Sequence, residues 1–112
     1  MEIKIKKWLY DGLEASHAIL AFCKNKTFSE YQDSLLLKSA VERQFEILGE
    51  SLRRVREIDP QLIDSIKGSR EAITFRNILA HEYSHIDDSI VWSIIDSDLL
   101  ELQENIQRHL SQ

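Results

Sequence analysis

Apolar residues recur every three or four positions along almost the whole chain, which is the spacing of amphipathic α-helices. The first stripe predicts a helix over residues 3–24, followed by a break at residues 25–30. The second stripe predicts a helix that ends at about Glu57, with Ser29 or Asp33 as its N-terminal cap. The apolar positions of this second helix are Leu37, Val41, Phe45, Leu48, Leu52, Val55 and Ile58.

Two further helical stripes follow in the second half of the chain. Asp59 and Pro60 are predicted to be the N-cap and first residue of a short helical turn. Ser69 is the predicted N-cap of a third helix that runs to about Ser84. The acidic pair at 87–88 is predicted to cap a fourth helix, whose stripe comprises Val91, Ile94, Ile95, Leu99, Leu102, Ile106 and Leu110.

Amphipathic helices with short connections predict an all-α fold, an up-and-down bundle of four to five helices in a single domain over residues 1–112. No segment shows the alternation of a strand, and only 3 Gly and 1 Pro interrupt the helical pattern. So small a core with several apolar faces is compatible with a homodimer.

The composition favours a cytoplasmic protein. No apolar run approaches the roughly 20 residues that cross a bilayer, so no membrane association is expected. The charged N-terminus, residues 1–7, is not followed by the apolar region of a signal peptide. The lone Cys23 cannot form an internal disulfide and is interpreted as a small buried hydrophobe in a reducing compartment.

The net charge of −5 is unevenly distributed. Residues 86–112 carry six acidic side chains and one arginine, whereas residues 1–85 carry 13 acidic and 13 basic side chains. Strong non-specific affinity for nucleic acid is therefore not expected, although a local basic site outside the last segment remains compatible with this balance.

The candidate chemistry lies near the end of the third predicted helix. At about 100° per residue, Arg76, Asn77, His81 and Tyr83 share one broad polar face. A guanidinium matches the geometry of phosphate oxygens, and an imidazole exchanges protons near neutral pH. These are the components of phosphoryl chemistry, but the spacing alone fits an ordinary solvated face equally well.

The same stretch also satisfies the H-E-x-x-H pattern of zinc metalloproteases, with His81 and His85 as ligands and Glu82 as base. Glu101 or Glu104 would then be the third ligand. We do not favour this zinc peptidase interpretation, because that fold needs a sheet-edged substrate groove and the chain contains no predicted strand. No metal site is therefore expected.

Three segments carry a resemblance to a known family: residues 40–50, with Glu-Ile-Leu-Gly-Glu at their end, residues 75–83 and residues 86–92. The second contains an arginine, four residues, a histidine, one residue and a tyrosine, which are Arg76, His81 and Tyr83. From Asp11 to the C-terminus the chain resembles the HepT-type toxins of the HEPN superfamily, the helical partners of minimal nucleotidyltransferases.

This resemblance implies a metal-independent endoribonuclease without a cofactor, which cleaves tRNA or mRNA as a homodimer formed through the motif helix. It implies that Arg76 and His81 are catalytic and that Asn77 supports them. It also implies that a cognate minimal nucleotidyltransferase antitoxin transfers AMP to Tyr83, as in type VII toxin–antitoxin systems. The alternative is a non-catalytic helical module that binds a nucleotide and presents it to a nucleotidyltransferase.

Three other groups of residues have simpler interpretations. Arg53, Arg54 and Arg56 form a basic cluster that is more typical of a solvated face than of a surface for RNA or the antitoxin. Glu50 and Arg54 are expected to form a solvated surface pair on one helix. Core or dimer contacts are the expected role of the aromatic residues Trp8, Phe45, Phe75 and Trp92.

Overall fold

The structure of the chain is a computed structural model that describes residues 1–81 and 86–112. All regular structure in these residues is helical, which confirms the predicted all-α class. The elements are α1 (Ile3–Cys23), α2 (Phe28–Asp33), α3 (Leu35–Ile58), α4 (Pro60–Ser65), α5 (Ser69–His81), α6 (Asp88–Ser93), the π-helical segment η1 (Ile94–Asp98) and α7 (Leu99–Leu110).

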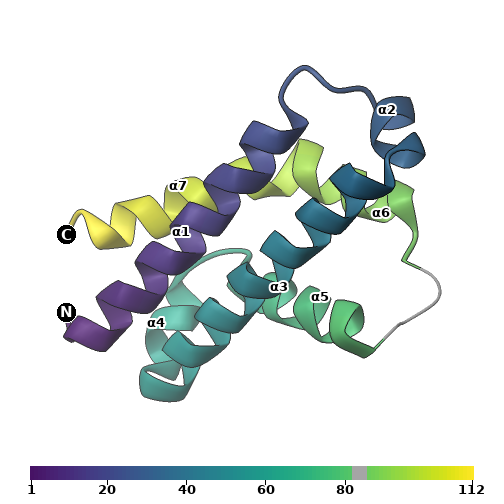
Figure 1. The fold of residues 1–112 in the computed structure, drawn as a ribbon. Coiled ribbons are helices and arrows are strands. Elements are labelled where there is room, and N and C mark those ends of the chain that lie inside the picture. Colours follow the sequence, from purple (N-terminus) through teal and green to yellow (C-terminus); the bar gives the residue numbers. More distant parts are fainter. Residues whose placement is uncertain (82–85) are drawn as a thin grey trace.

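The long helices run alternately in opposite directions, as Figure 1 shows, and this confirms the predicted up-and-down bundle. Helix α3 lies at the centre and packs on α1 along one side and on α5 along another. The C-terminal run of α6, η1 and α7 returns across the bundle, with α7 against α1 and α6 against α2. None of the helices in the described residues is long and apolar enough to cross a membrane.

The core is built from the predicted stripes. The α3 positions from Val41 to Val55 are buried, as predicted, whereas Ile58 at the end of the helix is 41% exposed. Phe45 and Phe75 form an edge-to-face pair between α3 and α5, with ring centroids 5.1 Å apart. Cys23 is buried, as predicted. Trp8 and Trp92 are only partly buried.

The break between α1 and α3 contains a helix that the sequence analysis missed. Neither Ser29 nor Asp33 is a cap. Thr27 caps α2, and its hydroxyl accepts from the Glu30 amide while the Glu30 carboxylate accepts from the Thr27 amide. This T-x-x-E capping box satisfies two backbone donors at once. Ser34, which follows α2, caps α3 instead.

The other predicted caps have mixed outcomes. Asp59 caps α4 with Pro60 as the first helical residue, and Asp87 caps α6, both as predicted. Ser69 is the first residue of α5 rather than its N-cap, and its buried hydroxyl donates to the carbonyl of Ile63, 2.8 Å away. The hydroxyl thus joins α5 to α4 rather than closing the first turn of α5.

The fourth predicted helix is interrupted by η1. Its buried residues Val91, Ile95 and Leu99 follow one another at intervals of four residues. An α-helix has about 3.6 residues per turn, so side chains at this interval would gradually rotate away from the core. The wider turn of the π-helix keeps these three side chains on the buried face. The prediction of one uninterrupted helix was wrong for this reason.

Helices α3 and α5 approach unusually closely at Gly49. A Cβ atom added to Gly49 would lie 2.2 Å from Cβ of Arg76 and 2.8 Å from the carbonyl oxygen of Ala72. Both contacts involve atoms that cannot move without moving α5. Gly49 therefore sets the distance between the two helices that carry the candidate site.

We predict that Gly49→Ala destabilises the protein by about 1–3 kcal/mol, the range for overpacking, although alanine is about 1 kcal/mol better than glycine inside a helix. Thermal unfolding followed by circular dichroism measures this as a lower Tm. Gly12→Ala is the matched control, because its Cβ would be too close only to the side-chain hydroxyl of Ser51 and to no backbone atom. The fall in Tm should be smaller for this variant, although the Ser51 hydroxyl must shift from its hydrogen bond with the Leu48 carbonyl. An unchanged Tm for Gly49→Ala would contradict the argument.

Candidate active site

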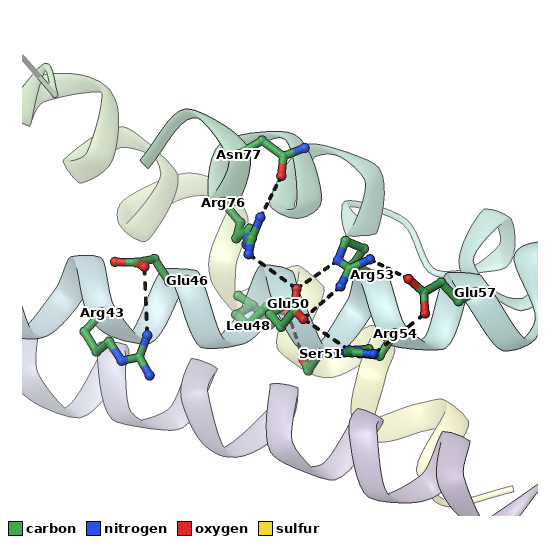
Figure 2. A network of polar contacts seen from close by, with 10 residues as sticks. All are labelled: Arg43, Glu46, Leu48, Glu50, Ser51, Arg53, Arg54, Glu57, Arg76 and Asn77. Carbon is green, nitrogen blue, oxygen red and sulfur yellow. Dashed lines mark hydrogen bonds and ion pairs between the residues drawn. The ribbon is translucent and has the colours of Figure 1, made fainter. Parts of the chain in front are cut away.

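Arg76 lies on α5 and faces α3, where its side chain is 29% exposed (Figure 2). Its Nη1 atom donates to Oδ1 of the neighbouring Asn77 over 3.2 Å. Its Nη2 atom lies 3.6 Å from Oε1 of Glu50, the residue that follows the close contact at Gly49. The guanidinium is thus oriented from two sides and still reaches solvent.

Glu50 is the centre of this polar network. Arg53 holds its carboxylate with two hydrogen bonds of 2.9 Å, Nε to Oε1 and Nη2 to Oε2, and Arg54 donates from Nε to Oε2 over 3.1 Å. The hydrogen bonds from Arg53 lower the pKa of Glu50, with further contributions from the charges of Arg53 and Arg76 and from Arg54. Glu50 is therefore a carboxylate near neutral pH.

The network changes the interpretation of two sequence features. Glu50 and Arg54 form the expected pair on α3, and Glu50 in addition connects α3 to Arg76 of α5. Arg53 and Arg54 are not an unpaired basic cluster, because both also form ion pairs with Glu57. Their positive charge is consequently bound within the network rather than available for a separate RNA surface.

The remaining predicted residues lie toward the end of α5. Asn77 and His81 are both exposed and are one helical turn apart. His81 is the last residue of α5. The next residue after Asn77, Ile78, is 47% exposed.

Tyr83 lies outside the described residues, as do Glu82 and His85 of the H-E-x-x-H pattern. The proposed metal ligands that the structure does describe, His81, Glu101 and Glu104, belong to no cluster of three or more side chains able to hold a metal among residues 1–81 and 86–112.

A groove leads along α1 and α3 to Arg76. Trp8 and Glu14 line it from α1, and Gln44, Ile47 and Glu50 line it from α3. The groove offers an aromatic ring and an amide next to a guanidinium. Four carboxylates, those of Asp11, Glu14, Glu46 and Glu50, also line the groove, against the two guanidinium groups of Arg43 and Arg76. A phosphate would therefore bind at a guanidinium group rather than along the groove as a whole.

Glu50 and Arg53 are the site residues that sequence reasoning missed. Both lie more than 20 residues before Arg76, so no helical periodicity relates them to it. The available signal was Gly49, because a glycine inside a long amphipathic helix indicates that another backbone approaches closely there. The polar residue next to such a glycine is a candidate partner for the approaching helix.

Comparison with known proteins assigns the chain to a family. A sequence model described as Ribonuclease HepT-like matches residues 13–109. Among similar proteins, one named Putative RNase MJ1380 from Methanocaldococcus jannaschii is 28% identical over 103 residues, covering 92% of this chain and 94% of the relative. Putative RNase MJ1216 from the same organism is 29% identical over 108 residues, covering 93% and 85%. No solved structure matches the chain significantly. The chain belongs to the Ribonuclease HepT-like family.

Proposed function

We propose that this protein is a metal-independent endoribonuclease in which Arg76 binds the scissile phosphate and His81 transfers protons. One observation carries the proposal. In a chain of a ribonuclease family, the partly buried Arg76 guanidinium is held between Glu50 and Asn77, and His81 is exposed at the end of the same helix. A fixed cation and a titratable imidazole are the groups that RNA cleavage needs.

The proposed reaction is internal transesterification. His81 accepts the proton of a ribose 2′-hydroxyl, and the 2′-oxygen attacks the adjacent phosphorus. The bond from phosphorus to the 5′-oxygen breaks, and the leaving oxygen takes a proton from a second acid. The products are a 2′,3′-cyclic phosphate and a 5′-hydroxyl, and Arg76 stabilises the charge that grows on the phosphorane oxygens.

A homodimer would supply the second acid. Each chain contributes one Arg76 and one His81, whereas the reaction has two proton-transfer roles, so a composite site at a two-fold axis would complete the set. The exposed Ile78 between these residues supports this arrangement, because a second copy of α5 would cover it.

We predict that Arg76→Ala and His81→Ala each abolish cleavage of tRNA or mRNA while circular dichroism and Tm stay close to wild type. Arg70→Ala is the matched control, since Arg70 is an exposed arginine of the same helix that pairs with Asp64. Mass spectrometry of the wild-type products should detect the cyclic phosphate. Full activity in either active-site variant would exclude the proposed roles, and an inactive wild type would favour a non-catalytic nucleotide-binding module.

We further propose that the protein is the toxin of a toxin–antitoxin pair and that a cognate minimal nucleotidyltransferase neutralises it by transferring AMP to Tyr83. Tyr83 is seven residues from Arg76 in the sequence. An added AMP group would bring a negative phosphate and a bulky nucleotide to the motif, where both would oppose RNA binding.

We predict that co-expression with the cognate nucleotidyltransferase and ATP raises the intact mass of the protein in steps of one AMP. Tyr83→Phe should lose this gain, because the acceptor hydroxyl is absent. Tyr10→Phe should keep it, since Tyr10 is an exposed tyrosine on α1, outside the motif. No gain in wild type, or an equal gain in Tyr83→Phe, would rule out modification at Tyr83.

A further inference from the structure

The network around Arg76 contains more positive than negative charge. Three guanidinium groups, from Arg53, Arg54 and Arg76, surround two carboxylates, Glu50 and Glu57 (Figure 2). One positive charge is left over. The least neutralised arginine is the one that donates the fewest hydrogen bonds to the two carboxylates.

Glu50 accepts its side-chain hydrogen bonds from Arg53 and Arg54. Arg53 takes one acceptor position on each oxygen in a two-point contact, and Arg54 takes a second position on Oε2. Arg76 approaches only Oε1, at 3.6 Å, which is beyond hydrogen-bond length. The excess charge of the network therefore lies mainly on Arg76.

We propose that Arg53 is a positioning residue for the candidate active site. By occupying both oxygens of Glu50, it prevents Arg76 from forming its own two-point pair with that carboxylate and so leaves the Arg76 guanidinium free for an RNA phosphate. This inference rests on the proposed ribonuclease function.

Arg53 and Arg76 compete for the Glu50 carboxylate because both can reach its oxygens. An arginine and a carboxylate form two parallel hydrogen bonds when nothing else occupies the oxygens. Nη2 of Arg76 is already 3.6 Å from Oε1, so a small movement would close the contact if Arg53 were absent. A phosphate would then have to break a charge-assisted pair before it could bind. Arg53 itself is fixed by Glu57, one turn further along α3.

Arg53→Gln and Arg54→Gln form a matched pair, because each removes one positive charge from the network and only the first removes the two-point contact with Glu50. We expect Arg53→Gln to raise KM for RNA roughly tenfold to hundredfold, in line with the strength of a charged hydrogen bond. Arg54→Gln should change KM by less than about threefold, as expected for exposed ion pairs.

The double variant Glu50→Gln with Arg53→Gln tests whether pairing of Arg76 with Glu50 causes the higher KM of Arg53→Gln. It removes the carboxylate that would capture Arg76 and restores the single excess positive charge, so its KM should be clearly lower than that of Arg53→Gln alone. Equal effects of Arg53→Gln and Arg54→Gln would show that only the total charge matters and would overturn the inference. A failure of the double variant to recover would also overturn it.

A crystal structure of Arg53→Gln separates this inference from the proposed function. Arg76 should move to within hydrogen-bond distance of both Glu50 oxygens. If the wild type cleaves RNA but Arg76 keeps its position in this variant, the inference fails and the ribonuclease proposal stands. If the wild type does not cleave RNA, the ribonuclease proposal fails, and the Arg76–Glu50 distances alone decide whether Arg53 controls the pairing.

Discussion

The close contact between α3 and α5 at Gly49 is the constraint on which the candidate site depends. Because Gly49 has no side chain, the stem of Arg76 rests directly on the α3 backbone, and its guanidinium reaches the level of Glu50. The Phe45–Phe75 pair lies one turn before Gly49 on α3 and one residue before Arg76 on α5, and it fixes the two helices in register. The core and the polar network are therefore parts of one helix–helix contact.

This contact explains how an acidic protein can present a local positive charge. The net charge is −5, and its excess comes from residues 86–112, whereas the network on α3 and α5 contains one more guanidinium than carboxylate group. The groove beside it is lined by more carboxylates than guanidinium groups, so the positive charge is confined to the network. A single cation fixed in a defined geometry favours binding of one phosphate over attraction along a whole nucleic acid. The affinity for RNA would then come from the site rather than from the surface.

The sequence predicted features whose interactions are local. The first two long helices and the caps Asp59 and Asp87 follow from apolar spacing and from contacts within three or four residues, and the structure confirms them. Ser69 was misjudged because its hydroxyl has a partner in the preceding helix. The link from Arg53 through Glu50 to Arg76 was missed for the same reason, since it joins two helices and depends on their distance at Gly49. The roles of Arg76, Asn77, His81 and Tyr83 remain predictions.

The central claim is that the scissile phosphate binds to the guanidinium of Arg76. A crystal structure with a short RNA carrying 2′-O-methyl groups, which cannot be cleaved, tests it most directly. We predict phosphate oxygens within hydrogen-bond distance of Arg76, His81 near the modified 2′-oxygen, and the two-point contact of Arg53 with Glu50 unchanged. A phosphate bound away from Arg76, or Arg76 paired with Glu50 in the complex, would contradict this mechanism.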